Sequence, residues 1–156
     1  MALVAHGYDR TTVDVDILVT ELSLKSIHNA LEGLGYIPPF PGSKNLRDTQ
    51  NGVRIEFLIT GAFPGDGKPK PVAFPDPADC AVELDGIKYV PLPKLIELKL
   101  SSGMTNPARL RDLADVQELI KMRGLSTDFA NLLDPYVRPK FLELHASVLN
   151  NPEPDL

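Results

Sequence analysis

The sequence lacks several features that would fix its location or its covalent structure. It has a single cysteine, Cys80, so no disulfide can form within the chain. No run of about 18 apolar residues could span a bilayer. The N-terminus has no basic stretch followed by an apolar segment and a small-residue cleavage site, which excludes a typical secretory signal. These absences favour a cytoplasmic protein with no membrane segment.

The chain also has fewer basic than acidic residues. The chain has 16 Lys and Arg residues against 21 Asp and Glu, a formal net charge of -5 at pH 7. This balance argues against a broad basic surface for nucleic acid, so any such contact should be a focused site. A length of 156 residues with 43% hydrophobic residues is typical of one globular domain with a real core.

The first half of the chain predicts strands and turns. Residues 13–19 alternate Asp with β-branched residues, as a strand does, and the leucines and isoleucine from Leu24 to Leu34 then recur at helical spacing. Asn51-Gly52 predicts a two-residue hairpin turn before an extended run over residues 53–59, and Asp85-Gly86 predicts a second, shorter hairpin. Between them, residues 61–79 hold five prolines and no periodicity, which predicts a long loop.

The second half predicts helices. One should begin at Pro91 and stop at Gly103, and the next should begin at an Asn106 cap and end at Gly124. A short helix capped by Ser126 should run through residue 133, and a last helix should cover residues 135–149. We expect the polar residues 150–156 to form a flexible tail.

The two aspartates of the first strand are its most unusual feature. Residues two apart in a strand project from the same face, so Asp14 and Asp16 leave the backbone roughly 7 Å apart on one side. Such neighbouring anions repel unless water or a cation offsets them, and an all-oxygen ligand set favours Mg2+ or Mn2+. The alternative, two aspartates on a solvated strand face, explains the pattern equally well.

A third carboxylate occurs in a comparable position. In "RIEFLI", Glu56 lies on the strand face opposite the apolar residues Ile55 and Phe57. Three carboxylates on adjacent strands could hold one or two divalent ions. Phosphoryl or nucleotidyl transfer needs such an arrangement, because the metals neutralise charge on the phosphates and help to activate the attacking hydroxyl.

The predicted helix after Asn106 places a carboxylate among apolar residues. On a helical wheel, Asp112 falls inside the inward arc and Asp115 at its edge. A buried carboxylate needs a partner, and the candidates are Lys99, Arg109 and Arg111. A structural ion pair and a substrate clamp explain this equally well. The residues of the inward arc are Leu110, Leu113, Val116, Leu119 and Ile120.

Together these segments resemble the nucleotidyltransferase fold superfamily, most closely its AbiEii-like and minimal nucleotidyltransferase-like branch. The stretch "HGYDRTTVDVDILV" contains an R-x-T-x-D-x-D core that looks like the metal-binding strand of that branch. The stretch "RIEFLI" is similar to its third-carboxylate strand, and "LPKLIELKLSSG…RLRDLADVQELI" is similar to its closing helical signature. The resemblance covers about residues 2–123.

The resemblance implies an α/β (α+β) fold, a mixed β-sheet flanked by helices. Residues 1–90 would form the sheet core with its Pro-rich loop, and residues 91–149 would add helices to the same domain. The implied activity moves a nucleoside monophosphate from an NTP to an acceptor hydroxyl with Mg2+ or Mn2+. In this branch some members are toxins that modify tRNA, so the implied partners include NTP, tRNA or another nucleic acid, and an antitoxin protein.

The resemblance also assigns roles to particular residues. Three carboxylates would be catalytic and would hold the metals, with Glu56 a possible base. Lys99 would meet nucleotide phosphate, and six residues in all would bind the nucleotide. The catalytic and metal set is Asp14, Asp16 and Glu56, and the nucleotide-binding set is Arg10, Thr12, Lys99, Arg109, Asp112 and Asp115.

The chain departs from the superfamily pattern at two places. It has no Gly-Gly or Gly-Ser turn before the Asp-x-Asp strand and begins at Met1, about where that turn would end, so we expect the true start to lie upstream. Glu56 also stands where Asp is more common, one methylene longer. Two other hypotheses stay open: a catalytically inactive nucleotide-binding or interaction module of this fold, and a structural domain with a solvated acidic face.

Overall fold

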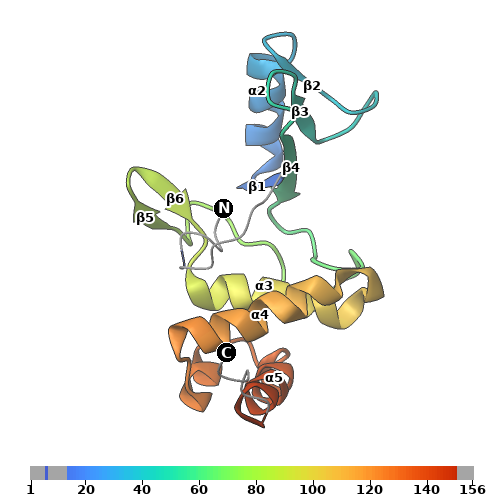
Figure 1. Cartoon of the computed structure of the whole chain (residues 1–156). Coiled ribbons are helices and arrows are strands. Elements are labelled where there is room, and N and C mark those ends of the chain that lie inside the picture. Colours follow the sequence, from blue (N-terminus) through green and yellow to red (C-terminus); the bar gives the residue numbers. More distant parts are fainter. Residues whose placement is uncertain (1–5, 7–13, 151–156) are drawn as a thin grey trace.

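The computed structural model describes His6 and residues 14–150 and contains strands and helices in a mixed order (Figure 1). The expected fold class, a mixed sheet flanked by helices, is confirmed. The strands are β1 (Asp14–Val19), β2 (Tyr36–Ile37), β3 (Leu46–Asp48), β4 (Arg54–Ile59), β5 (Val82–Leu84) and β6 (Ile87–Tyr89). The helices are α2 (Glu21–Leu31), α3 (Leu92–Thr105), α4 (Leu110–Arg123) and α5 (Arg138–Asn150), with 3-10 turns η1 (Pro107–Arg109) and η2 (Thr127–Leu132).

The main sheet has four strands in the order β1-β4-β3-β2. Strand β1 runs parallel to β4, while β3 is antiparallel to both β4 and β2. Because alternate residues of a strand point to opposite faces, Val19 and Phe57 lie on the face that α2 covers. Leu24, Ile27 and Leu31 of α2 pack against that face, and together they form a small core. The other face carries Asp14 and Asp16.

The two predicted hairpins have different outcomes. In the second, Asp85 and Gly86 form the two-residue turn between β5 and β6, with φ of 53° and 75°, the positive values that a type I′ turn requires. In the first, the hairpin exists but the predicted two-residue turn is wrong, because the loop spans residues 49–53. The Asp48 carboxylate accepts hydrogen bonds from Gln50 N at 2.8 Å and Asn51 Nδ2 at 2.7 Å, which favours the wider loop.

The helices follow the expected order with three corrections. Helix α4 begins at Leu110 and not directly after Asn106, because Asn106 caps the 3-10 turn η1 instead. Helix α3 continues to Thr105 instead of stopping at Gly103, because Gly103 lies at the crossing with α4, where a Cβ would meet Leu113 Cγ at 2.5 Å. Leu110, placed on the inward arc from the sequence, is exposed at the first residue of α4. The predicted end of α4 is confirmed, since Gly124 adopts the left-handed conformation at φ 56°.

The predicted helices after α4 are confirmed in outline only. The segment after Ser126 is the 3-10 turn η2, and the Ser126 side chain makes no capping hydrogen bond. Helix α5 begins at Arg138, three residues later than Pro135, where the sequence placed its start.

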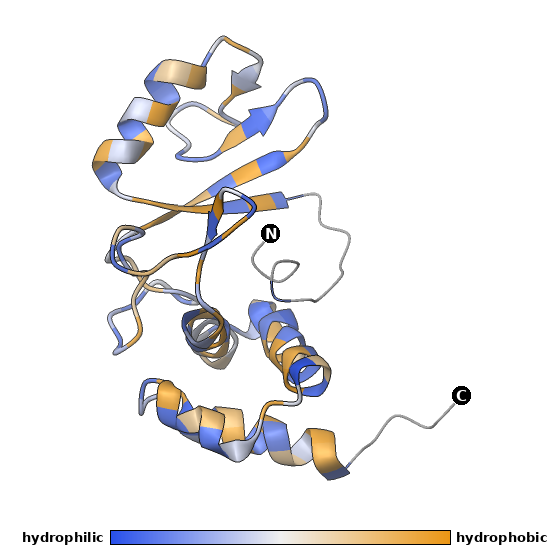
Figure 2. Ribbon diagram, turned by 90° about the vertical axis from the view of Figure 1, so that its left-hand side faces the viewer, coloured by the Kyte–Doolittle hydropathy of each residue, from blue (hydrophilic) through white to orange (hydrophobic). Residues whose placement is uncertain are grey.

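A larger core joins α3, α4 and α5. Its fully buried members include Ile96, Leu100, Val116, Leu119 and Phe141. The sheet with α2 forms one layer and these helices form another, as both views show (Figures 1 and 2). The described part of the chain therefore contains two separate apolar cores. Within the described residues, no helix combines the length and the apolar character needed to cross a membrane.

The Pro-rich loop over residues 61–79 connects the two layers and is ordered by its own contacts. Gly61 N donates to Phe74 O at 2.8 Å and Phe74 N donates to Ala62 O at 2.9 Å, which closes the base of the loop. Lys70 Nζ pairs with Asp66 and donates to Pro64 O at 2.6 Å. These bonds hold the loop in a single course beside α3.

Candidate active site

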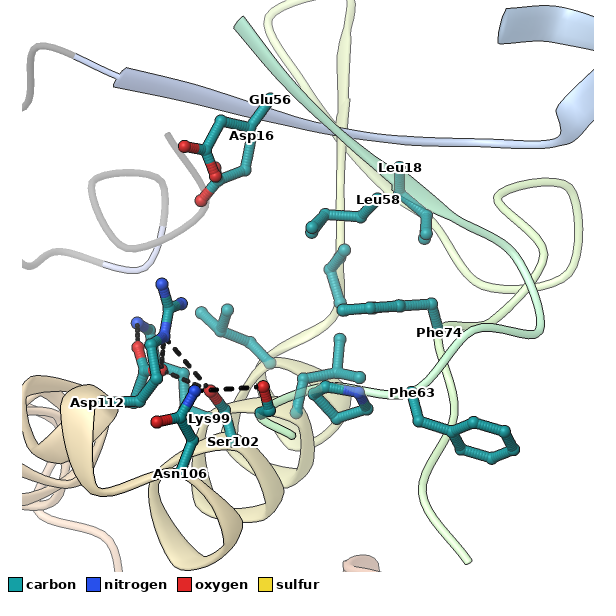
Figure 3. A pocket seen from close by; sticks show the side chains of 16 residues that line it. Asp16, Leu18, Glu56, Leu58, Phe63, Phe74, Lys99, Ser102, Asn106 and Asp112 are labelled. Carbon is teal, nitrogen blue, oxygen red and sulfur yellow. Dashed lines mark hydrogen bonds and ion pairs between the residues drawn. The ribbon is translucent and has the colours of Figure 1, made fainter. Parts of the chain in front are cut away.

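A cavity of about 400 Å³ lies between the two layers (Figure 3). One wall is the sheet face opposite α2, the other is formed by α3 and the start of α4, and the Pro-rich loop closes one side. The lining residues are Asp16, Leu18, Glu56, Leu58, Phe63, Pro64, Gly65, Phe74, Val90, Leu95, Leu98, Lys99, Ser102, Asn106, Arg109 and Asp112. Half of them are apolar, and the charged ones gather at one end (Figure 3).

The acidic wall consists of Asp16 and Glu56. They are register partners on the parallel strands β1 and β4, so their backbones are about 5 Å apart. Both side chains point into the cavity side by side (Figure 3). Two carboxylates this close repel each other, and a divalent cation would relieve the repulsion. Leu18 and Leu58 lie two residues further along each strand, on the same face, and continue this wall with apolar surface.

Asp14 is placed differently from its neighbour. Its register partner is Arg54, whose Nε donates to Asp14 Oδ1 at 2.7 Å and whose Nη2 donates to Oδ2 at 3.1 Å. Asp14 does not line the cavity. In the described part of the chain, no group of three or more His, Cys, Asp or Glu residues is arranged to hold a metal ion. The structure therefore brings Asp16 and Glu56 together without Asp14, and the three-carboxylate metal site stays a prediction.

The basic wall is a network of charged side chains between α3 and α4. Lys99 Nζ donates to Asp112 Oδ1 at 3.0 Å and to Asp115 Oδ2 at 2.8 Å. Asp112 Oδ2 also accepts from Ser102 Oγ at 2.7 Å and from Arg109 Nε at 2.9 Å. Two of the three candidate partners, Lys99 and Arg109, thus contact the buried Asp112.

Asp112 stays ionised although it is buried. Burial alone would raise the pKa of its carboxyl group, but the nearby Lys99 charge, the hydrogen bonds from Ser102 and Lys99, and the Arg109 charge together lower it below its ordinary value. This carboxylate therefore carries a permanent negative charge near neutral pH, and the two cations beside it are already partly neutralised.

Two residues of the site have no functional role in the sequence interpretation. Ser102 links Asp112 and Arg109, and Asn106 donates from Nδ2 to Gly65 O at 3.2 Å, which ties the loop to the helix layer. Ser102 lies three residues after Lys99 on the same helix face, so its spacing could have indicated it. Asn106 was assigned only as a cap, a role it also has through Ala108 N at 2.9 Å. The predicted site residues Arg10 and Thr12 lie outside the described residues.

The charge of the site decides which ligands it can accept. Among the described residues, the charged side chains that line the cavity are three carboxylates and two cations, and Asp115 beside Lys99 adds a fourth carboxylate. The formal charge is then about two negative units, which repels a free anion and attracts a divalent cation or a cation-loaded phosphate. A ligand with an apolar ring could use the surface of Leu18, Leu58 and Phe74 at the other end.

No protein-family model, curated protein or solved structure matches this chain. The resemblance to the nucleotidyltransferase superfamily is therefore carried by the motifs alone and stays a prediction.

Proposed function

We propose that the protein is a metal-dependent nucleotidyltransferase that moves a nucleoside monophosphate from an NTP to an acceptor hydroxyl. The observation that carries the proposal is the register pairing of Asp16 with Glu56 across a cavity from Lys99 and Arg109. Nucleotidyl transfer requires carboxylates that face the phosphates of the nucleotide. The proposal is supported by a cavity with carboxylates opposite two cations and with apolar surface that suits a nucleobase.

The residues fit a magnesium ion that arrives with the nucleotide. Mg2+ is commonly held by one or two carboxylates together with substrate phosphates and waters, and Asp16 and Glu56 supply two. A bound Mg2+ or Mn2+ would neutralise charge on the phosphates and lower the pKa of the acceptor hydroxyl. The ion pair of Asp14 with Arg54 is exposed to solvent, which screens it, so a metal ion could compete with Arg54 for Asp14.

The acceptor is proposed to be tRNA or another nucleic acid, and an antitoxin protein is a possible partner of such an enzyme. Glu56 or Asp16 would take the proton of the attacking hydroxyl, because both face the cavity where that hydroxyl must enter. Lys99, Arg109, Asp112 and Asp115 would form the nucleotide-binding wall.

One observation favours the second candidate, a catalytically inactive nucleotide-binding module. Only two of the three expected carboxylates converge, because Asp14 pairs with Arg54 in the described structure. Such a module would bind nucleotide in the same cavity and release it unchanged.

The deciding experiment measures label transfer from each α-labelled NTP into total tRNA and into the protein, with Mg2+ or Mn2+. Asp16→Asn and Glu56→Gln should abolish transfer, whereas Glu83→Gln, an exposed strand carboxylate away from the cavity, should not. Transfer by the wild type that persists in both site variants would contradict the proposed catalytic residues. Absence of transfer with intact nucleotide binding would favour the inactive module, and absence of both would exclude the two candidates.

A further inference from the structure

The two cations of the basic wall are held in different ways. The Lys99 ammonium group lies between Asp112 Oδ1 at 3.0 Å and Asp115 Oδ2 at 2.8 Å, and those two side chains are only 8% and 3% exposed. Two buried carboxylates balance its charge and occupy two of its three N–H donors. A ligand anion would therefore have to compete with them for the positive charge.

Arg109 keeps much of its guanidinium available. Its side chain is 54% exposed and lines the cavity. Toward the described residues it donates through Nε alone, to Asp112 Oδ2 at 2.9 Å and to Ser102 Oγ at 3.3 Å. A guanidinium group has five N–H donors in a planar fork, so those on the two terminal nitrogens are left to a ligand.

The Nε bonds also orient this fork. Asp112 is buried and is itself fixed by Lys99 and Ser102, so it holds one edge of the guanidinium in place. A planar donor pair fixed in this way matches two oxygens of one phosphate group, which an ammonium group cannot do.

We propose that Arg109 is the residue that contacts the phosphate chain of the nucleotide, while Lys99 neutralises Asp112 and Asp115 without touching the ligand. The inference rests on the nucleotidyltransferase function proposed above and revises the role that the family resemblance gives to Lys99. Because the described residues give the cavity a net negative formal charge, the ligand should be a triphosphate in its magnesium complex.

Binding measurements on matched variants test this assignment. Isothermal titration calorimetry is run with inorganic triphosphate and with each of the four NTPs, with and without Mg2+. The variants are Arg109→Gln, Arg109→Lys, the double variant Lys99→Met/Asp115→Asn, and Arg111→Gln. Arg111 is an exposed arginine of α4, two residues after Arg109, and it does not line the cavity, so it controls for loss of one positive charge.

We expect Arg109→Gln to weaken binding of the magnesium triphosphate by about ten-fold or more, and Arg109→Lys by several-fold, because Lys keeps the charge but loses the fork. Arg111→Gln should stay within about two-fold of the wild type, since an exposed charge is screened by salt. The double variant removes one charge of each sign, so it should lose less than Arg109→Gln. Circular dichroism of each variant checks that it is folded.

Several results would overturn the assignment. Arg109→Gln that binds as tightly as Arg111→Gln would exclude the proposed contact, and so would a folded double variant that loses as much binding as Arg109→Gln. If the double variant does not fold, the affinities of Arg109→Lys and Arg109→Gln still decide. If both variants bind the magnesium triphosphate as tightly as the wild type, Arg109 does not contact the phosphate chain. A wild type that binds no magnesium triphosphate would refute the proposed function and this inference with it, whereas normal binding that is insensitive to Arg109 refutes the inference alone.

Discussion

Replacement of Lys99 by Met should destabilise the protein far more than loss of an ordinary surface lysine. In the folded protein, Lys99 places its ammonium group at 3.0 Å from Asp112 and 2.8 Å from Asp115. Both carboxylates are more than nine-tenths buried, so water cannot replace the lost charge. Removal of one partner from a buried ionic network typically costs about 3–5 kcal/mol in the free energy of unfolding.

The expected value for Lys99→Met lies near the lower end of that range, at about 3 kcal/mol. The reason is that Asp112 keeps its hydrogen bonds from Ser102 and Arg109 in the variant. Urea denaturation near neutral pH, followed by far-ultraviolet circular dichroism, measures the difference directly. Lys140→Met is the matched control, because Lys140 pairs with the 64% exposed Glu143 on the surface of α5 and should cost at most about 1 kcal/mol.

A second variant separates charge from packing. In Lys99→Met/Asp115→Asn one buried negative charge disappears together with the cation, so part of the lost stability should return. If Lys99→Met costs no more than Lys140→Met, the network does not contribute to stability in the way the structure implies. A double variant less stable than Lys99→Met alone would also contradict the electrostatic explanation.

Three further changes test other contacts. Because the pKa of Asp112 is lowered in the folded protein, its ionised form stabilises the fold above its ordinary pKa of 3.8, and this stabilisation is lost as the pH falls through the lower folded-state pKa. In Asp112→Asn, the free energy of unfolding measured with urea should therefore depend less on pH at acid pH. An unchanged pH dependence would contradict this. Gly103→Val should cost about 1–3 kcal/mol in the free energy of unfolding, because its Cβ would meet Leu113 Cγ at 2.5 Å, and an unchanged midpoint would show that the α3–α4 crossing can widen. Gly65→Ala should make the Pro-rich loop more sensitive to limited proteolysis, since Gly65 has φ +78° and a Cβ there would lie 2.8 Å from the Ser102 carbonyl oxygen; equal cleavage rates would refute the close approach.

Local sequence patterns predicted the features that depend on neighbouring residues. Asp85-Gly86 predicted a hairpin turn because an Asp-Gly pair accepts the positive φ that both positions adopt. The period of one helix predicted the burial of Asp112. Its partners Lys99 and Arg109 could be named because few cations were within reach. These features need no knowledge of how distant segments meet.

Features that depend on tertiary contacts could not be predicted in the same way. Strand alternation placed Asp14 and Asp16 on one face, but only the register of β1 with β4 sets Asp16 opposite Glu56 and Asp14 opposite Arg54. Gly103 has the appearance of a helix end in the sequence, yet the close crossing of two helices keeps it inside α3.

The separation of the two apolar cores gives the walls of the cavity unequal freedom to change during evolution. Asp16 and Glu56 project from the strand face opposite the small sheet core, so substitutions there leave the packing of α2 against the sheet intact. Lys99 and Asp112 lie within the contact of α3 with α4, beside residues of the larger core, and most changes there also disturb folding. Descendants of this chain could therefore change the acidic wall by one or two substitutions on the sheet, while the pairing of Lys99 with Asp112 in the basic wall would persist as long as the fold does.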